Sequence, residues 1–406
     1  MDYQETLSWL YNQLPFYQKS GQDAYKKDIS NMVDFFNKNG ADYLFFDTIH
    51  VGGTNGKGSV SHMLSSVLQE SSLKVGLFTS PHLIDFKERI KINGKSIDES
   101  SIINFVDHYK HDFNSIKMSF FEMSVALAFK YFKNNNVDIA IIEVGLGGRL
   151  DATNVLFPKL SIITNISRDH TNLLGFSLDL ISKEKGGIIK ENTPVLVGEK
   201  SKATIGLEDI ANNLKSELLY AKDHSYDCDL KGAYQFKNIN TCVTAVNILN
   251  NSGFRISNTN ITKGLKNVVL NTGLLGRWQI ISKKPLVICD IAHNAAALKT
   301  VFKQLEMYPQ KKKIILGFSK DKDLDEMISC LNKHYEYHIC GSHNSRIINP
   351  DLLLSIFNKR GLSAKKHNYA IDAYNYLLKK HTVGNLIIFT GSSFIVSDIL
   401  KYLDNV

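Results

Sequence analysis

Apolar residues recur at helical spacing near the start of the chain, and further on they gather in short runs between amphipathic segments. The helical spacing covers residues 3–14 and 29–36, with Pro15 between them. The β-prone runs that predict strands lie at 48–51, 74–78, 137–144, 160–164 and 194–197. Helices are expected at 59–69 and 120–132. Such alternation indicates βαβ units and a mostly parallel sheet covered by helices on both faces.

A second series of the same kind begins near residue 285. Its predicted strands lie at 286–289, 314–316, 337–340 and 386–389, and a helix is expected at 294–305. This stretch of roughly 120 residues is long enough to hold its own core. The polar segment Ser282–Pro285 before it reads as a hinge. We therefore expect two domains, residues 1–282 and 283–406.

Composition excludes several classes of protein. Of the 406 residues, 43% are hydrophobic and 22% are charged, which is typical of globular proteins. No apolar run approaches the ~20 residues of a membrane-spanning helix, and Met1–Glu5 is too polar for a secretory signal. The five cysteines form no C-x-x-C pair, which favours a reduced, cytoplasmic protein. The net charge of +8 suits anionic small molecules as well as nucleic acid, so it does not distinguish these partners. The basic run Lys311–Lys313 lacks the aromatic pattern of a nucleic-acid site.

The strongest local signal is a glycine-rich run between a predicted strand and a predicted helix. It spans residues 52–59 and reads GGTNGKGS. Glycines let successive backbone N–H groups point at phosphate oxygens, and the N-terminus of the following helix adds partial positive charge. Lys57 would contact the β- and γ-phosphates, and Ser59 would offer a hydroxyl to Mg²⁺. Gly58 separates these two residues, unlike the common G-x-x-x-x-G-K-[ST] spacing, and a plain turn with a solvated lysine is the alternative.

An apolar strand further along ends in a carboxylate, Glu143. That arrangement resembles a Walker B strand, whose acid reaches the Mg²⁺ of a bound nucleotide. A salt bridge from Glu143 to a surface base is the alternative. Together the patterns predict an α/β protein with an N-terminal P-loop ATPase domain, built on a mostly parallel sheet, and a smaller Rossmann-like α/β C-terminal domain. A compact P-loop GTPase or kinase would not need the second unit.

Further motifs resemble the Mur ligase superfamily and, within it, folylpolyglutamate synthase, which is often bifunctional with dihydrofolate synthase. The loop itself, GTNGKGS at 53–59, has the form found in this superfamily, and EVGLGGRLDATNV at 143–155 is highly specific. The other motifs, in chain order, are TSPHL at 79–83, ERI at 88–90, FFE at 120–122, DH at 169–170, EKGGIIK at 184–190, GR at 276–277, DIAHN at 290–294, DKD at 321–323 and FTGS at 389–392. The resemblance thus covers about residues 50 to 392.

The resemblance implies ATP-dependent amide bond formation. A carboxylate of the pterin-bearing substrate would take the γ-phosphate of ATP, and the amine of L-glutamate would attack the resulting acyl phosphate. The implied substrates are dihydropteroate, folates, L-glutamate and ATP, with Mg²⁺ as cofactor. Two Mg²⁺ ions are expected, because the acceptor carboxylate and the γ-phosphate repel each other. A monomer that acts without nucleic acid or membrane is expected.

The resemblance also assigns roles to individual residues. The implied ATP contacts are Gly53, Thr54, Asn55, Gly56, Lys57, Gly58, Ser59, Asn238, Arg277 and Asp290. The implied metal ligands are Ser80, Glu143, His170 and Lys185, with Lys185 carrying a carbamate, and the implied catalytic residues are Lys57, His170 and Lys185. The pterin–benzoate substrate would contact Ser119, Leu150, Asp151 and Ala152, and L-glutamate would bind near His293 and Ser392.

Structural roles compete with several of these assignments. His170 could bond a backbone carbonyl instead of a metal, and Lys185 could form a salt bridge with Glu184. Arg149 could pair with Asp151 or with Glu122.

Three departures from the family pattern concern substrate binding. Ile291 and Ala295 replace the Gly and Pro of D-G-A-H-N-P, and Leu275 replaces the Pro of P-G-R, but the polar groups remain. The stretch from Gln18 to Asn39 lacks the D-L-G-L-E-R-type loop that family members often use to hold dihydropteroate. A folylpolyglutamate synthase without dihydrofolate synthase activity is therefore the alternative.

Overall fold

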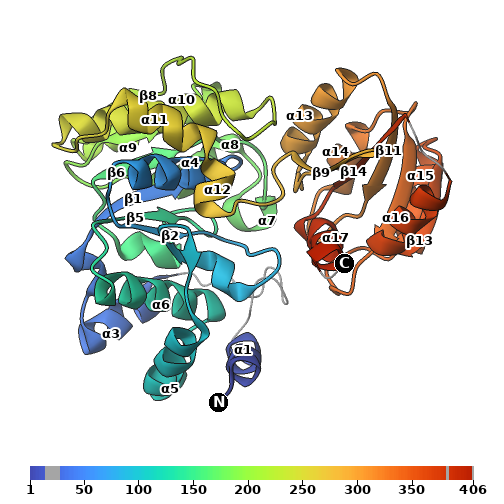
Figure 1. Cartoon of the computed structure of the whole chain (residues 1–406). Helices are drawn as coiled ribbons and strands as arrows, with labels where there is room; N and C mark the ends of the chain where they lie inside the picture. The colour runs from blue at the N-terminus through green and yellow to red at the C-terminus, as the bar shows by residue number, and fades with distance from the viewer. Residues whose placement is uncertain (14–27, 381–383, 405–406) are drawn as a thin grey trace. The chain divides into compact units, whose positions relative to one another are not determined.

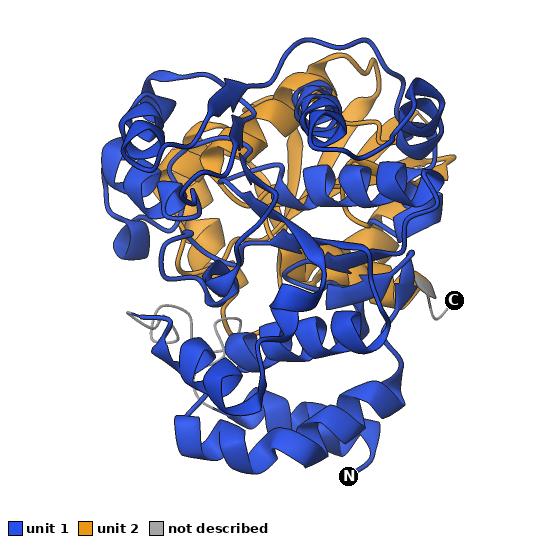
Figure 2. Ribbon diagram, turned by 90° about the vertical axis from the view of Figure 1, so that its left-hand side faces the viewer, with its two compact units in different colours: residues 1–229, 235–274 blue, residues 230–234, 275–406 orange. Residues whose placement is uncertain are grey.

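The computed structural model describes residues 1–13, 28–380 and 384–404, and its chain contacts divide it into two compact units (Figure 2). Unit 1 comprises residues 1–229 and 235–274, and unit 2 comprises residues 230–234 and 275–406. Strand β9, Gln279–Lys283, pairs with the sheet of unit 2. Unit 2 therefore begins a few residues before the boundary that the polar hinge suggests.

Unit 1 is built on an eight-stranded sheet of order β4-β3-β2-β5-β1-β6-β7-β8. Its strands are β1 Asp47–Gly52, β2 Val75–Phe78, β3 Ile90–Ile92, β4 Lys95–Ser96, β5 Ile139–Glu143, β6 Leu160–Ile163, β7 Val195–Val197 and β8 Leu218–Tyr220. The six strands from β2 to β8 in that order are parallel, and β3 and β4 extend one edge in antiparallel pairing. The expected mostly parallel sheet is confirmed.

Helices cover both faces of this sheet (Figure 1). They are α1 Tyr3–Asn12, α3 Ser30–Asn39, α4 Lys57–Glu70, α5 Glu99–Ile116, α6 Phe120–Asn134, α7 Thr171–Leu174, α8 Leu178–Gly186, α9 Gly206–Asn213, α10 Gln235–Asn251, α11 Asn258–Lys266 and α12 Val268–Thr272. Helices α4, α10 and α11 lie on one face, and α3, α5 and α6 lie on the other. Helices α4 and α11 pack so closely that a Cβ on Gly264 would lie 2.5 Å from the Cα of Val67.

An aromatic cluster holds the α3–α6 layer together. The ring of Phe129, which is fully buried, stacks on Phe36 at 5.9 Å and meets Tyr43 at 6.0 Å and Phe46 at 6.3 Å. Offset and edge-to-face ring pairs add to the apolar area that each ring buries. This cluster fixes α6 against the sheet, and Ser119 lies at the N-terminus of α6.

Replacing Phe129 with alanine is expected to destabilise unit 1 by about 3–5 kcal/mol, since the change leaves a cavity among the other three rings. Denaturant unfolding, followed on the transition that reports unit 1, measures the effect. Phe176→Ala serves as the control, because that ring is 72% exposed and its loss should change stability by less than about 0.5 kcal/mol. A similar small effect for Phe129→Ala would show that the cluster does not hold this layer.

Unit 2 contains a six-stranded sheet of order β13-β12-β11-β14-β10-β9, parallel except for β9. Besides β9, its strands are β10 Leu286–Cys289, β11 Lys311–Leu316, β12 Glu336–Gly341, β13 Ala364–Tyr369 and β14 Asn385–Thr390. Its helices are α13 Ala295–Glu306, α14 Leu324–Ser329, α15 Pro350–Lys359, α16 Ala370–Lys379 and α17 Ser393–Asp404. The predicted second α/β unit is confirmed.

Two expectations fall partly outside the described residues. The helix predicted over 3–14 runs from Tyr3 to Asn12, and residue 14 lies in the segment 14–27, which is not described. Residues 18–27 of the stretch searched for a dihydropteroate loop lie in the same segment.

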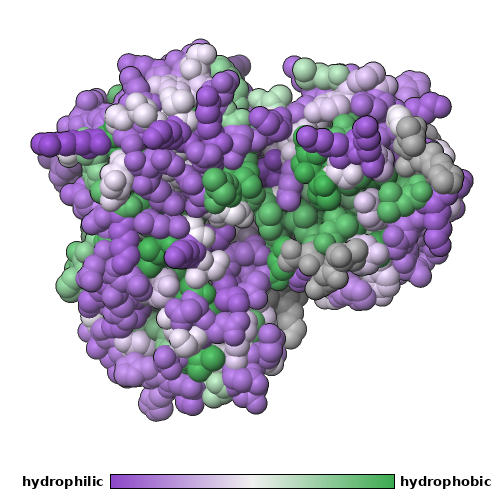
Figure 3. All heavy atoms as spheres, in the orientation of Figure 1, coloured by the Kyte–Doolittle hydropathy of each residue, from purple (hydrophilic) through white to green (hydrophobic). Residues whose placement is uncertain are grey.

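Hydrophilic residues cover most of unit 1 on the face that Figure 3 shows. In the part of the chain that the structure describes, no helix combines the length and the apolar character needed to cross a membrane.

Candidate functional site

Four adjacent parallel strands of unit 1 end at the same edge of the sheet, and each is followed by a predicted site segment. The phosphate loop follows β1, Ser80 follows β2, Glu143 ends β5, and residues 164–170 follow β6. The pairing register places Val51 beside Glu143 and Gly52 beside Ile163. Ligands of open α/β sheets bind at the carboxyl ends of the strands, so the sheet itself brings these segments together.

Two glycines of the phosphate loop have backbone conformations and surroundings that strongly disfavour a side chain. Gly53 has φ +130° and Gly56 has φ +88°, which L side chains rarely adopt. A Cβ on Gly53 would lie 2.0 Å from Oγ1 of Thr164, and a Cβ on Gly56 would lie 2.4 Å from Oδ1 of Asn238. Helix α4 begins directly after the loop, at Lys57, so its first N–H groups face the position that a phosphate would occupy.

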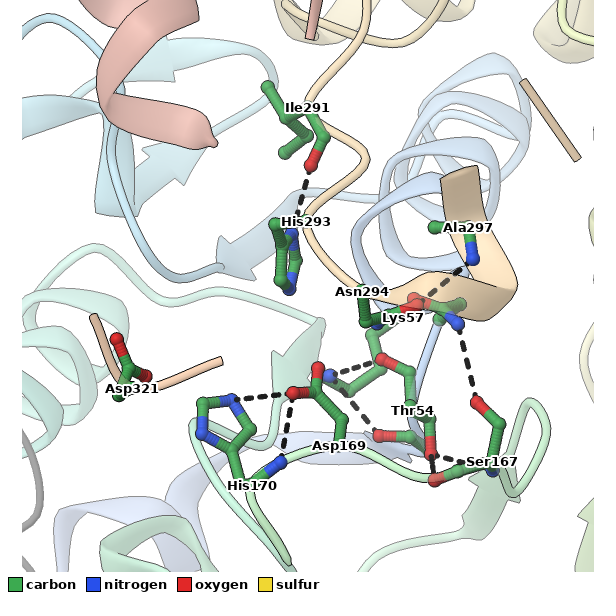
Figure 4. A network of polar contacts seen from close by, with 12 residues as sticks. Thr54, Lys57, Ser167, Asp169, His170, Ile291, His293, Asn294, Ala297 and Asp321 are labelled. Carbon is green, nitrogen blue, oxygen red and sulfur yellow. Dashed lines mark hydrogen bonds and ion pairs between the residues drawn. The ribbon is translucent and has the colours of Figure 1, made fainter. Parts of the chain in front are cut away.

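Two lysines meet at one carbonyl of this loop. Nζ of Lys57 donates to the carbonyl oxygens of Gly53 and Thr54, both at 3.1 Å (Figure 4). Nζ of Lys185, on α8, donates to the same Gly53 oxygen at 2.8 Å. Burial, followed by the nearby charge of Lys57, lowers the pKa of Lys185 to about 7. The structure does not show the alternative salt bridge between Lys185 and Glu184. Instead, Nη2 of Arg149 donates to Oε1 of Glu184 at 2.7 Å.

Glu143 and Ser80 offer oxygen donors at neighbouring strand ends. The buried Glu143 carboxylate accepts the backbone N–H of Ser80 at 3.1 Å, which holds the β2 loop against the end of β5. Carboxylate and hydroxyl oxygens suit Mg²⁺, which also keeps water and phosphate oxygens as ligands. No group of three His, Cys, Asp or Glu side chains arranged for a metal occurs in the ranges that the structure describes. Glu143 and Ser80 fit a Mg²⁺ whose other ligands are water and phosphate oxygens. The Lys185 ammonium, a donor in this structure, would fit only as a carbamate.

His170 lies at the start of α7 in a left-handed conformation, with φ +50°. Such a backbone costs a non-glycine residue roughly 1–2 kcal/mol and is often kept at functional sites. The backbone N–H of His170 donates to Oδ1 of Asp169 at 2.9 Å, and its Nε2 lies 3.8 Å from the same oxygen (Figure 4). The structure thus places His170 at the sheet edge that carries the phosphate loop.

Asn238, on the first turn of α10, lies against the phosphate loop. Its Nδ2 donates to Oε1 of Gln235 at 2.7 Å, and Nε2 of Gln235 donates to the hydroxyl of Ser59 at 3.2 Å. No motif or spacing singles out Gln235 in advance. Asn238 is therefore connected to the loop both by proximity to Gly56 and through Gln235.

Two of the residues expected near the pterin–benzoate substrate, Ser119 and Asp151, hold the local backbone in place through hydrogen bonds. Ser119 caps α6, with its backbone N–H donating to Oε2 of Glu122 at 2.6 Å. Asp151 is buried, which raises its pKa, and it accepts the N–H groups of Leu146 at 2.8 Å and Thr153 at 3.0 Å. These contacts show how Asp151 shapes the loop after β5. Leu150 and Ala152 flank Asp151 on this loop, with Ala152 buried and Leu150 half-buried.

In unit 2, Asp290 follows β10 and organises the start of the domain. Its Oδ2 accepts the hydroxyl of Tyr234 at 2.6 Å and the N–H of Trp278 at 2.9 Å, and its Oδ1 accepts the N–H of Ala292 at 3.0 Å. Burial raises the pKa of this carboxyl, which the Tyr234 bond and the charge of Arg277 partly offset. Tyr234, which sequence reasoning did not identify, explains why residues 230–234 belong to unit 2.

His293 and Ser392 lie at the carboxyl edge of the unit 2 sheet. Nδ1 of His293 lies 2.9 Å from the carbonyl oxygen of Ile291, which can only accept, so Nδ1 is the donor of this bond (Figure 4). The buried Ser392 hydroxyl lies 3.4 Å from that of Ser319. Both are thus placed where ligands of such sheets bind.

Two family models together match most of the chain. The Mur ligase middle domain matches residues 51–277, and the Mur ligase glutamate ligase domain matches residues 276–393. A dihydrofolate synthase/folylpolyglutamate synthase of Buchnera aphidicola is 31% identical over 87% of this chain and 86% of its own length. The Bacillus subtilis enzyme of the same name is 29% identical over 99% of both chains.

Solved structures match over the whole chain. Escherichia coli FolC in complex with DHPP and ADP covers 100% of this chain and 98% of its own, with 25% identity and a TM-score of 0.85. A bifunctional folylpolyglutamate synthase/dihydrofolate synthase with Mn, AMPPNP and L-glutamate bound has the same coverage, 25% identity and a TM-score of 0.86. The chain belongs to the Mur ligase family and, within it, to the ATP-dependent ligases of the dihydrofolate synthase/folylpolyglutamate synthase group.

Proposed function

We propose that the protein adds L-glutamate both to dihydropteroate, giving dihydrofolate, and to the glutamate chain of folates. The observation that carries the proposal is the meeting of the phosphate loop, Glu143 and Lys185 at one edge of the unit 1 sheet. The names of the relatives, and the DHPP, ADP and L-glutamate in their structures, support the choice of substrates.

The reaction proceeds in two steps. A carboxylate oxygen of the acceptor attacks the γ-phosphorus of ATP, and the bond to the β-phosphate oxygen breaks, which releases ADP. The amine of L-glutamate then attacks the acyl carbon, the bond to the phosphate oxygen breaks, and the amine loses a proton. A carboxylate alone is a poor acyl donor, so the phosphate is needed as a leaving group.

The protein contributes position and charge. The N-terminus of α4 and the Lys57 ammonium neutralise the phosphoryl group as it transfers. Mg²⁺, for which two ions are expected, would be held by Glu143, Ser80 and His170 and would offset the charge of the phosphates. The proposed active form is a monomer.

Lys185 is proposed to carry a carbamate. Burial lowers the pKa of this amine to about 7, so it loses its proton far more readily than an ordinary lysine, and the neutral amine can attack CO₂. The N–C bond forms, one C–O π bond opens, and the proton leaves to solvent. The product is an anionic oxygen ligand beside Lys57, so the two lysines would no longer repel each other.

Comparing dihydropteroate with reduced folates as acceptors of glutamate distinguishes the bifunctional enzyme from a folylpolyglutamate synthase alone. Phosphate release would be measured with Mg-ATP and L-glutamate, separately with dihydropteroate and with reduced folate monoglutamates, and the products identified by mass. Glutamate on both acceptors is the expected result. Addition to reduced folates alone would leave a folylpolyglutamate synthase, in keeping with the missing D-L-G-L-E-R-type loop. Phosphate release that depends on neither acceptor would contradict the proposal.

A further inference from the structure

We propose that Asn165 and Glu199 form a positioning pair that holds the phosphate loop in its ATP-binding shape. Asn165 follows β6 and Glu199 follows β7, on the side of β1 opposite Glu143. Neither belongs to the motifs of the loop or of the metal ligands. The inference rests on the proposed use of ATP and adds two residues to it.

Asn165 binds two consecutive residues of the loop. Its carbonyl oxygen accepts the N–H of Thr54 at 2.9 Å, and its side-chain Oδ1 accepts the N–H of Asn55 at 3.0 Å. The neighbouring Ser167 contributes a similar pair, since its N–H and carbonyl both bond the Thr54 hydroxyl, at 3.0 and 3.1 Å. The segment after β6 therefore fixes the first half of the loop.

Glu199 sets the orientation of the Asn165 amide. Nδ2 of Asn165 donates to Oε1 of Glu199 at 3.0 Å. A carboxylate can only accept, so the NH₂ group must face Glu199 and the oxygen must face the N–H of Asn55. An amide rotated by 180° would lose both bonds. The pair thus works in one orientation only.

Close packing keeps Glu199 in place. A Cβ on the preceding Gly198 would lie 2.5 Å from the carbonyl oxygen of Thr164 and 2.6 Å from Oγ1 of Thr241. The second oxygen of Glu199 pairs with Lys237, the residue before Asn238. Glu199 therefore connects the segment after β6 with the first turn of α10, the two elements that flank the loop.

The consequence concerns the donors left for phosphate. The N–H of Thr54 is bonded to the backbone carbonyl of Asn165, and the N–H of Asn55 is bonded to its side chain. Neither N–H can turn toward a ligand without losing its bond to Asn165, and only the Asn55 bond depends on the pair. The donors aimed at phosphate are then those of the first turn of α4, together with Lys57. Loss of the pair should weaken ATP binding more than it changes the chemistry of bound ATP.

The test changes the charge of each member of the pair and measures the binding of an ATP analogue. In Asn165→Asp, two carboxylates would face each other, and the dissociation constant of a non-hydrolysable ATP analogue is expected to rise by about 10-fold or more. Glu199→Gln keeps an acceptor for Asn165 and should stay within about 2-fold. In the double variant the introduced glutamine amide can donate to the introduced aspartate, so binding should recover to within about 3-fold of wild type. At saturating ATP, kcat should change by less than about 3-fold in all three.

Controls separate this inference from the proposed function. Glu191→Gln, an exposed change of the same kind in unit 1, should leave binding unchanged. If the unmodified protein does not bind the analogue, the proposed use of ATP fails. If it binds, and Asn165→Asp either matches it or is not rescued by Glu199→Gln, the positioning pair is refuted. Should thermal unfolding show that Asn165→Asp does not fold, Glu199→Ala decides: binding weaker than in Glu199→Gln supports the pair, and equal binding refutes it.

Discussion

Replacing Lys57 with methionine is expected to lower kcat/KM for ATP by about 10³-fold or more. Methionine keeps most of the length and volume of the side chain and removes the charge. The ammonium lies at the loop, 3.1 Å from the Gly53 and Thr54 carbonyl oxygens, at the start of α4. Phosphoryl transfer depends almost entirely on positioning and on neutralising charge, so loss of this cation should act mainly on the transition state.

Binding and turnover would be measured separately. The expected result is a large fall in kcat with a smaller loss of ATP affinity, because the N–H groups of the first turn of α4 still bind the nucleotide. Lys57→Arg, which keeps the charge but not the shape, should retain more activity than Lys57→Met. Equal activity of Lys57→Met and wild type would remove Lys57 from the catalytic residues.

Replacing Lys185 with alanine is expected to reduce activity by about 10²-fold or more, while ATP binding and folding change little. Lys185 is buried, and as a carbamate it would place negative oxygens beside Lys57. A small carboxylate such as propionate, added to the alanine variant, should restore part of the activity because it can occupy the space and the role of the carbamate. Lys185→Arg should stay inactive, since a guanidinium does not form a carbamate at neutral pH.

A spectroscopic measurement checks the modification itself. Wild-type protein exposed to ¹³C-labelled bicarbonate should give a carbamate signal that Lys185→Ala lacks. Lys183→Ala is the matched control, since Lys183 lies on the same helix and is exposed. A signal that persists in Lys185→Ala, or activity of that variant close to wild type without added carboxylate, would contradict a carbamate at Lys185.

The strands and the phosphate loop could be predicted because their signals are local. Residues 139–143 form a continuous apolar run before a carboxylate, and β5 has these bounds. The glycine-rich loop is contiguous, and a strand and a helix flank it as expected, although α4 begins at Lys57 rather than Ser59. The end of each parallel strand could thus be assigned to one edge of the sheet.

Helix α10 was not predicted, although its buried Ile239, Cys242, Val243, Val246 and Leu249 recur at helical spacing. Helix α5 is a second helix of this kind. Its buried Ile102, Phe105, Tyr109 and Phe113 do recur at helical spacing, so this helix was within reach of the same reasoning.

Long-range contacts in the site could not be read from the sequence. Lys185 and Gly53 are 132 positions apart, and the sheet brings them together. The partner of Arg149 is Glu184, whereas the sequence suggested Asp151 or Glu122; Asp151 is occupied by backbone N–H groups and Glu122 by the cap of α6. The bonds of Asn165 to the loop likewise depend on the order of strands.

The most direct test of the proposed reaction follows one oxygen atom. Dihydropteroate with both carboxylate oxygens labelled as ¹⁸O would be incubated with Mg-ATP, L-glutamate and the protein. An acyl phosphate predicts that each product molecule carries one ¹⁸O in its new amide and that the released phosphate carries the other. Unlabelled phosphate formed together with the glutamyl product would contradict transfer of the γ-phosphate to the acceptor carboxylate, and with it the central claim.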